Sequence, residues 1–247
     1  MAPHKCLRKA NSNQAAVLIS IITPLFNEEE CVGTFLESIK LLEGDFELIL
    51  VDGGSTDNTM SEVQKQVSEF GEKVRILNAE RGRAVQMNEG AKEAKGDILL
   101  FLHVDCVIPK DSLEMIERVI HRQNVVGGAF RLAFSSSDTM LRAVSIFGNL
   151  RTQITKTFFG DFGIFLRKDI FRRINGYNTA VLLEDVELCR RAKKHGRLTQ
   201  IDGYILASPR KYLGKGKMRL TTLFILVCLF NELRLRPRLL TRRMTNG

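Results

Sequence analysis

The sequence predicts one α/β domain with a mostly parallel central sheet and helices on both faces. The first observation is size, because 247 residues that are 44% hydrophobic can bury one sizeable core but not two catalytic domains. The second is an alternation of apolar, strand-length runs with segments of helical spacing in the first half of the chain. The third is that polar residues directly follow the apolar runs, at the edge where parallel sheets bind ligands.

The first half divides into four predicted strands, each followed by a predicted helix. Continuous apolar runs rich in β-branched residues predict buried strands, and apolar residues three and four positions apart predict helices. The strands cover 16–24, 46–54, 74–78 and 97–105, and the helices cover 28–42, 57–70, 84–94 and 109–122. Because strands joined by helices pair in parallel, we expect this half to form the parallel part of the sheet.

The second half is less regular. A segment that alternates after its glycine start predicts a strand over 127–134, and a Gly-rich turn begins a second strand over 160–167. Helical spacing is expected over 138–157, after a loop of three serines, and over 183–195, where the acidic pair Glu184 and Asp185 opens the helix.

Positive charge is concentrated near the C-terminal end. The formal net charge is +9, and from residue 207 onward ten basic residues stand against one acid, so the remaining chain is neutral. This asymmetry favours an anionic partner: a membrane surface, phosphate groups or nucleic acid. We expect a disordered basic tail over 1–15, an α/β domain over 16–206, and a basic and apolar C-terminal segment over 207–247.

Cysteine usage and the N-terminal residues bear on the compartment. The five cysteines are scattered without CxxC spacing, which indicates reduced thiols and no zinc site. The first 14 residues are basic but lack the apolar core of a secretory signal. The sequence therefore predicts a cytoplasmic protein, with peripheral contact to a membrane left open.

Five short motifs follow predicted strands or open predicted helices. They are Pro24-Leu25-Phe26-Asn27-Glu28, Asp52-Gly53-Gly54-Ser55-Thr56-Asp57, Asn88-Glu89-Gly90-Ala91, His103-Val104-Asp105 and Glu184-Asp185. In this order and spacing, the sequence resembles the inverting family 2 glycosyltransferases over about residues 18–203. The resemblance implies the GT-A fold, a Rossmann-like fold of nucleotide-diphospho-sugar transferases. More narrowly, the segments 81–106, 127–134, 160–165 and 182–191 resemble a small subgroup labelled arsenosugar-biosynthesis-type glycosyltransferases.

The resemblance implies a nucleotide site after the first two strands. Asp52 could accept a hydrogen bond from the imide N–H of the base, and Glu28 could contact the base or ribose, although turn and cap roles also suit both. Arg81 and Arg83 precede a helix and suit a diphosphate, with surface solvation as the alternative for either. The expected nucleotide-binding residues are Pro24, Phe26, Asn27, Glu28, Asp52, Gly54, Arg81, Arg83, Asn88, Val104, Arg210 and Lys211.

A divalent cation is expected to stabilise the departing diphosphate. Asp105 stands at the tip of a predicted strand and can offer oxygen to Mg²⁺ or Mn²⁺; the alternative is a cap for the following helix. His103 replaces the first acid of the family's D-x-D pattern. Three roles are open for it: metal ligand, diphosphate contact, or packing. Asp105 and His103 are the expected metal residues.

Direct displacement at the anomeric carbon needs a base that takes the proton of the acceptor hydroxyl. By resemblance Asp185 is that catalytic base, and Glu184 orients the base or the acceptor. The alternative is that both acids complement the helix dipole. Gly160, Asp161 and Phe162 lie on a turn that resembles the family's acceptor or sugar wall.

Two C-terminal segments carry further expectations. Residues 208–217 are basic and contain glycine, and we expect them to close over the diphosphate as a lid through Arg210 and Lys211. Residues 223–230 are apolar throughout but too short to span a bilayer. They indicate a helix that lies in an anionic membrane surface, packs on the domain, or forms a dimer interface.

These patterns together predict a metal-dependent, inverting transfer of a hexose-type sugar from a UDP-sugar to a hydroxyl of a metabolite, glycan or lipid. A sugar-1-phosphate nucleotidylyltransferase would instead carry G-x-G-x-R-x-x-P after the first strand, where this chain has Pro24 to Glu28. A nucleotide or nucleic-acid binder without catalysis would fit the basic tail. However, only Tyr212 offers an aromatic platform among the basic residues there, so nucleic acid is not an expected partner.

Overall fold

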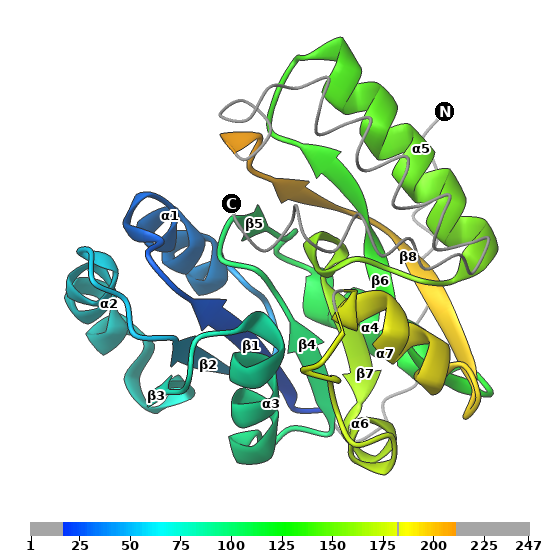
Figure 1. The fold of residues 1–247 in the computed structure, drawn as a ribbon, viewed down its shortest axis with the longest axis horizontal. Coiled ribbons are helices and arrows are strands. Elements are labelled where there is room, and N and C mark those ends of the chain that lie inside the picture. The colour runs from blue at the N-terminus through cyan, green and yellow to red at the C-terminus, as the bar shows by residue number, and fades with distance from the viewer. Residues whose placement is uncertain (1–16, 182, 211–247) are drawn as a thin grey trace, which may run out of the picture.

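A mixed eight-stranded sheet runs through the computed structural model, which describes residues 17–181 and 183–210 (Figure 1). The strands are β1 (Ile19–Leu25), β2 (Phe46–Asp52), β3 (Val74–Asn78), β4 (Ile98–Phe101), β5 (Cys106–Val107), β6 (Val125–Phe134), β7 (Ile164–Arg167) and β8 (Arg197–Ala207). Their order across the sheet is β3-β2-β1-β4-β7-β6-β8-β5. The expected N-terminal tail, Lys211 and nearly all of the expected C-terminal segment lie outside the described residues.

The β3-β2-β1-β4 half of the sheet is parallel, as the alternation of strands and helices predicted. Every residue of β1 and β2 is buried, because helices cover both faces of these apolar strands. Leu25 pairs with Asp52, so both strands end at the same level of the sheet. The loops that follow them therefore leave the sheet side by side.

The β4-β7-β6-β8-β5 half has mixed pairing. Strand β7 is antiparallel to both β4 and β6, β6 is parallel to β8, and β5 is antiparallel to β8. Across the whole sheet four strand pairs are parallel and three antiparallel, so the sheet is mostly parallel.

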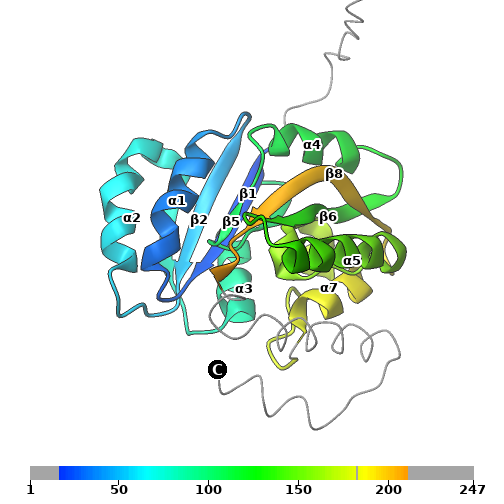
Figure 2. The same cartoon turned by 90° about the horizontal axis from the view of Figure 1, so that it is seen from above.

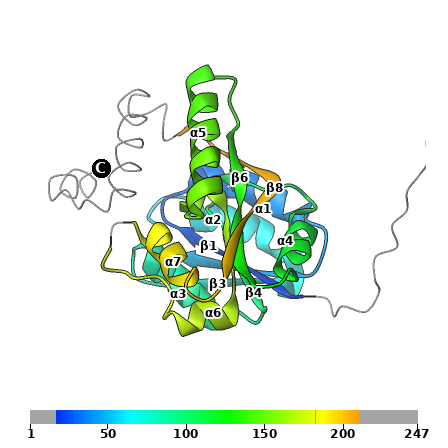
Figure 3. The same cartoon turned by 90° about the vertical axis from the view of Figure 1, so that its right-hand side faces the viewer.

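Helices pack on both faces of the sheet (Figures 2 and 3). They are α1 (Glu29–Lys40), α2 (Thr59–Val67), α3 (Arg83–Glu93), α4 (Ser112–Ile120), α5 (Thr139–Thr155), α6 (Lys168–Arg173) and α7 (Glu184–Ala192), with short 3-10 helices η1 (Ser68–Lys73) and η2 (Gly160–Phe162). Helices α1, α2 and α4 lie on one face, and α3, α6 and α7 lie on the other (Figure 3). Helix α3 is tied to the loop before α7 by Asn88, whose side chain donates to the backbone of Tyr177 at 2.9 Å.

Two predicted strands are only about half as long as expected, and both changes shape the site. The strand expected over 97–105 ends at Phe101, because its partner β7 begins at Ile164 opposite that residue. Residues 102–105 are thereby released into a loop. The segment expected as a strand over 160–167 begins instead as η2, and Gly163 separates η2 from β7 with a left-handed φ of 62°.

Candidate active site

A pocket lies at the carboxyl ends of β1 and β4, where parallel sheets bind ligands. Its walls come from the β1–α1 loop, the start of α3 and the loop after β4. The lining residues are Pro24, Leu25, Phe26, Glu28, Arg83, Gln86, His103, Val104 and Asp105. Seven of the nucleotide and metal residues expected from the sequence therefore meet in one place, joined by Leu25 and Gln86.

The turn after β2 is held in shape by Asp52. Both Asp52 side-chain oxygens accept hydrogen bonds from the Ser55 backbone N–H, and the Ser55 hydroxyl donates to Oδ1 at 2.6 Å. Gly54 donates its N–H to the same carboxylate at 3.1 Å and has a φ of 83°, which suits glycine. Asp52 is thus a turn-stabilising residue in this structure, and it lies outside the pocket lining.

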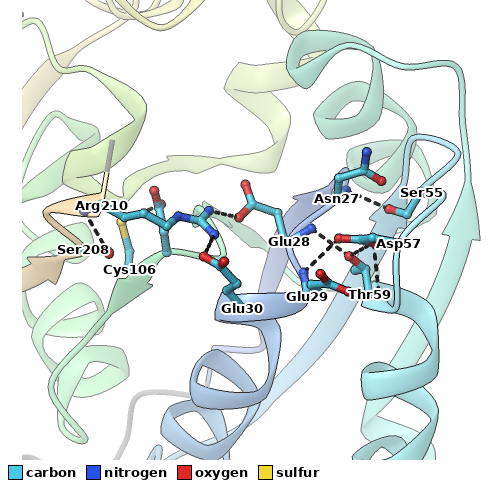
Figure 4. A network of polar contacts seen from close by, with 11 residues as sticks. Asn27, Glu28, Glu29, Glu30, Ser55, Asp57, Thr59, Cys106, Ser208 and Arg210 are labelled. Carbon is cyan, nitrogen blue, oxygen red and sulfur yellow. Dashed lines mark hydrogen bonds and ion pairs between the residues drawn. The ribbon is translucent and has the colours of Figure 1, made fainter. Parts of the chain in front are cut away.

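The β1–α1 loop is joined to that turn through Asn27. Asn27 has a left-handed φ of 52°, and its side-chain oxygen accepts the Thr56 N–H at 2.8 Å. In return, the Asn27 N–H donates to the hydroxyl of Ser55 (Figure 4). The two motifs that the sequence assigned to the nucleotide therefore form one rigid unit.

Arg210 connects the end of the described chain to the pocket. Its guanidinium donates to Glu28 at 2.5 Å and to Glu30 at 2.9 Å (Figure 4). Glu28 lines the pocket, and its side chain is only 17% exposed, so this ion pair fixes one pocket wall. Lys211, the second expected lid contact, lies outside the described residues.

Two arginines lie at the start of α3. The Arg81 guanidinium stacks 4.0 Å from the centre of the Phe26 ring, a cation–π contact that positions both side chains. Arg83 lines the pocket, and its Nε lies 3.8 Å from Glu184. Burial lowers the pKa of Arg83, but nearby carboxylates outweigh it and raise that pKa overall; they belong to Glu184, Asp185, Asp161 and Asp105.

Gln86 is a site residue that the sequence analysis missed. It is 2% exposed, and its Nε2 donates at 2.7 Å to the carbonyl oxygens of both Leu25 and Val51. Its Oε1 accepts the Gly82 N–H at 3.3 Å. One amide thus joins the ends of β1 and β2 to the start of α3. A lone glutamine inside a helical segment gave no signal of this, because its partners are backbone groups distant in sequence.

His103, Asp105 and Asp161 form a cluster that could hold a metal ion. One ligand atom from each lies within 4.8 Å of the others. Nδ1 of His103 lies 3.0 Å from Oδ1 of Asp161, while its buried Nε2 has no hydrogen-bond partner among the described residues. A mixed set of carboxylates and imidazole fits a divalent cation. The structure thus adds Asp161, expected in the acceptor wall, to the two expected metal residues.

Asp185 is buried beside this cluster. It is 8% exposed, and its Oδ2 accepts the Gly160 backbone N–H at 2.9 Å. Burial, reinforced by the neighbouring charge of Glu184, raises the pKa of Asp185 to about 6. A Cβ on Gly160 would lie 2.4 Å from His103 and 3.1 Å from Asp185, so only glycine allows these side chains their positions. Glu184, 9% exposed, begins α7 with Asp185.

Asn88 and Phe162 are two further expected site residues that lie outside the pocket lining. Both ends of the Asn88 amide are bonded to the backbone of Tyr177, which holds α3 against the loop before α7. Phe162 is 1% exposed and packs inward from η2. Tyr177 itself is buried near the acids, and burial raises its pKa well above the usual value, so its hydroxyl stays protonated.

Two expectations about the compartment can be compared with the described residues. Three of the five cysteines, Cys31, Cys106 and Cys189, fall among them, and none of the three is part of a disulfide. Within 17–181 and 183–210, no helix is both long enough and apolar enough to cross a bilayer. The apolar run over 223–230 lies outside that part of the chain.

Curated relatives share part of this chain. The undecaprenyl-phosphate 4-deoxy-4-formamido-L-arabinose transferase of Proteus mirabilis is 30% identical over 155 residues, which are 60% of this chain and 48% of that protein. The dodecaprenyl-phosphate galacturonate synthase of Rhizobium johnstonii is 32% identical over 124 residues, 47% of this chain and 37% of that protein. This chain therefore spans half or less of the length of these relatives.

Solved structures share the fold. A mannosyltransferase from Pyrobaculum calidifontis, solved with GDP-mannose and Mn²⁺, aligns with a TM-score of 0.70 at 19% identity, over 89% of this chain and 64% of that one. TarS residues 1–349 from S. aureus, solved with UDP-GlcNAc, aligns with a TM-score of 0.59 at 17% identity, over 86% of this chain and 66% of that one. The fold is therefore that of GT-A glycosyltransferases.

The sequence model of the glycosyl transferase family 2 matches residues 20–174, more than half of the chain. The matched region contains all but the first residue of β1, all of β2 to β4, the pocket lining, and the His103, Asp105 and Asp161 cluster. The arrangement at the carboxyl edge of the sheet, the GT-A fold and this match agree, and the chain belongs to glycosyl transferase family 2.

Proposed function

We propose that this protein transfers a sugar from a nucleoside diphosphate sugar to an acceptor hydroxyl with inversion, using Asp185 as the base. The observation that carries the proposal is a buried carboxylate beside the pocket whose pKa is raised to about 6. A base with a pKa near the working pH is ionised and still basic enough to accept a proton. A carboxylate that only complemented a helix dipole would gain nothing from such burial.

The donor is proposed to lie in the pocket between the β1–α1 loop and α3. Phe26, stacked on Arg81, offers an apolar surface for a nucleobase, and Glu28 stands within reach of the base or ribose. Arg83 is the first residue of α3 and lines the pocket, where its positive charge can neutralise the diphosphate. Uridine diphosphate is the carrier to test first, and guanosine diphosphate the main competitor.

The residues His103, Asp105 and Asp161 are proposed to hold a divalent cation. A bound cation would neutralise negative charge on the departing diphosphate. Mg²⁺ strongly prefers oxygen ligands, whereas first-row transition ions accept an imidazole nitrogen. Because His103 supplies nitrogen where the family pattern has an acid, we expect Mn²⁺ to bind this site more tightly than Mg²⁺.

The acceptor is proposed to carry a hydroxyl. The names of the two curated relatives both include a prenyl phosphate, and a phosphate acceptor is the alternative that these names raise. A phosphate monoester has a second pKa of about 6 and is largely ionised at neutral pH, so it needs no base. The buried Asp185 therefore favours a hydroxyl, either on a metabolite, a glycan or a lipid; a lipid would bring the protein to a membrane surface peripherally.

The first prediction concerns the donor and metal sites. Titration calorimetry with UDP, GDP and other nucleoside diphosphates should give binding to one of them that requires Mn²⁺. Replacing Asp105→Ala should weaken that binding at least about tenfold, because a charge-assisted contact contributes about 1.5–3 kcal/mol. Asp202→Ala, which removes an 84% exposed acid on β8, serves as the matched control and should bind normally.

A substitution of His103 tests the metal preference of the same site. The variant His103→Asp restores an all-oxygen ligand set and should move the preference from Mn²⁺ toward Mg²⁺. Direct Mn²⁺ binding, followed by electron paramagnetic resonance without nucleotide, reads this out independently of activity. Equal Mn²⁺ affinity in wild type, Asp105→Ala and His103→Asp would contradict the metal site, and absence of nucleotide binding under every condition would contradict the proposed donor site.

A further inference from the structure

Helix α5 exposes a continuous apolar face. Four large side chains on it are strongly exposed: Ile146 at 60%, Phe147 at 39%, Leu150 at 55% and Ile154 at 74%. Their spacing of one, three and four residues places them along one side of the helix. The opposite side of α5 is buried. One side of the helix is therefore packed against the domain, whereas its apolar face is exposed among the described residues.

This concentration is unusual within the described part of the chain. Seven large hydrophobic side chains are exposed there, and four of them lie on α5. The remaining three, Leu41, Tyr204 and Leu206, are divided between the end of α1 and β8. Scattered exposed hydrophobic residues need no explanation, whereas a contiguous patch marks a surface that is covered by something.

The course of the chain indicates which segment could pack on the exposed face of α5. Strand β8 ends at Ala207, whose carbonyl accepts the N–H of Ser135, four residues before α5 begins. The chain therefore leaves the sheet next to the start of α5. Beyond Arg210 the sequence continues for 37 residues, and these include an uncharged apolar run over 223–230.

We propose that residues 223–230 of this same chain pack on the exposed apolar face of α5. The 12 residues from 211 to 222 start four residues after Ala207 and can extend about 40 Å, which is longer than the roughly 25 Å that the 17 residues of α5 span. Packing the two surfaces together removes both from water, and tethering in one chain keeps the effective concentration high. The proposal does not depend on the proposed function.

The covered helix lies directly behind part of the candidate site. A Cβ on Gly148 of α5 would lie 3.3 Å from the ring of Phe162 in η2, so the two elements are in close contact. Arg151 of α5 donates to the carbonyl of Thr157 at 2.9 Å. Segment 157–162, which carries Gly160 and Asp161, thus packs on α5. A segment that covers the other side of α5 would therefore also stabilise the position of this wall of the site.

Cross-linking to the native Cys228 tests the contact in the full chain. In a Cys6→Ser, Cys31→Ser background, which leaves Cys106 and Cys189 buried, a cysteine is introduced as Leu150→Cys or Ile154→Cys. The matched control is Gln64→Cys, on the exposed side of α2. After treatment with a short bis-maleimide, peptide mass spectrometry should find intramolecular links to Cys228 from the α5 positions but not from Gln64→Cys. Equal yields from α2 and α5 would overturn the proposal.

Two other occupants of the face give distinct results that also overturn the proposal. A second copy of the chain would give links between chains, whose yield rises with protein concentration. A lipid surface would leave Cys228 unlinked and would shift the emission of a polarity-sensitive dye on Ile154→Cys when anionic vesicles are added.

A thermal measurement avoids cysteine chemistry. The variant Ile154→Asp should lower the melting temperature by several degrees, because it places a charge under the cover. Leu41→Asp changes a residue that is 70% exposed, close to the 74% of Ile154, and should leave the melting temperature nearly unchanged. Equal melting temperatures for the two variants would contradict a cover on α5. Phe230→Asp should lower the melting temperature as Ile154→Asp does. The double variant Ile154→Asp, Phe230→Asp should lose less than the sum of the two single losses.

Discussion

At the scale of single residues, the site depends on two side chains, His103 and Asp185, that pack against Gly160. Its N–H holds one oxygen of Asp185, and the space where a side chain would stand is filled by His103 and Asp185. The second oxygen of Asp185 and Nε2 of His103 are buried without a hydrogen-bond partner among the described residues. Such unsatisfied polar atoms cost stability, and they are expected where a substrate will complete the contacts.

The protonation of Asp185 gives a prediction for activity and stability. Since burial raises its pKa to about 6, kcat/KM of the wild type should fall below about pH 6, where the base is protonated. Asp185→Asn should lower kcat at pH 7.5 by at least about 100-fold. The raised pKa also affects stability, because the folded state favours the protonated form of Asp185. Its contribution to the free energy of unfolding is complete below pH 3.8 and is lost as the pH rises through about 6.

The stability arm follows from that sign. The uncharged Asp185→Asn protein should match the melting temperature of the wild type near pH 4 and exceed it at pH 7.5. Asp202→Asn, which replaces an exposed acid, is the control. The difference in melting temperature between this variant and the wild type should not change with pH. Two results together would count against Asp185 as the base. One is a difference in melting temperature between Asp185→Asn and wild type that does not change with pH, and the other is a wild-type kcat/KM that does not fall below about pH 6.

At the scale of elements, the site is positioned by the junction of β1, β2 and α3. Gln86 makes this junction, because its amide binds the carbonyl groups of Leu25 and Val51 and the N–H of Gly82. Gly53 is equally constrained, since a Cβ there would lie 3.0 Å from the Gln86 amide. The relative position of the β1–α1 loop and the arginines at the start of α3 therefore depends on a buried polar side chain.

Replacing that side chain tests its role. Gln86→Leu keeps a similar volume but leaves the buried Val51 carbonyl without its side-chain donor. We expect the free energy of unfolding to fall by about 1–3 kcal/mol and nucleotide affinity to fall with it. Denaturant unfolding and calorimetry measure the two effects. Gln64→Leu, on the exposed side of α2, is the control, and an equal effect of both variants would exclude the positioning role.

At the scale of the whole molecule, the pocket joins segments that are far apart in sequence. Glu28 follows the first strand of the sheet, and Arg210, its ion-pair partner, follows the last strand in the chain, 182 residues later. Ser208, next to the end of β8, donates its N–H to the carbonyl of Asp105. The end of β8 is therefore anchored both to Glu28 on the pocket wall and to Asp105 in the loop after β4.

The Arg210 ion pair leads to a prediction on donor binding. Arg210→Ala leaves the half-buried Glu28 carboxylate unpaired where the diphosphate is proposed to bind, so donor affinity should fall several-fold. If Arg210 acts through Glu28, the Arg210→Ala, Glu28→Gln pair should recover part of the loss; if it contacts the diphosphate directly, as a lid would, the pair should not. Arg118→Ala, on an exposed α4 ion pair, is the control. Unchanged affinity in Arg210→Ala would contradict both roles.

Local patterns were enough to predict the parallel half of the fold and its functional edge. The apolar runs of β1, β2 and β4 are buried on both faces, and such strands have a recognisable composition. The order of motifs also indicated the family. Strand β8 was missed because two of its exposed positions carry the apolar residues Tyr204 and Leu206, which hides the alternation in the sequence, and because its place beside β6 depends on a distant pairing. The narrower arsenosugar-type resemblance remains a prediction.

The sequence by itself determined the family, the α/β class and the pairing of His103 with Asp105, since these depend on residue types at short spacing. Only the tertiary structure decided that Asp161 joins that pair, that Asp52 is engaged by its own turn, and that Gln86 ties three elements together. These contacts connect residues that are distant in the chain or involve backbone groups, and backbone groups are the same in every residue. Their partners are therefore set by the way the sheet and helices pack, which no local pattern records.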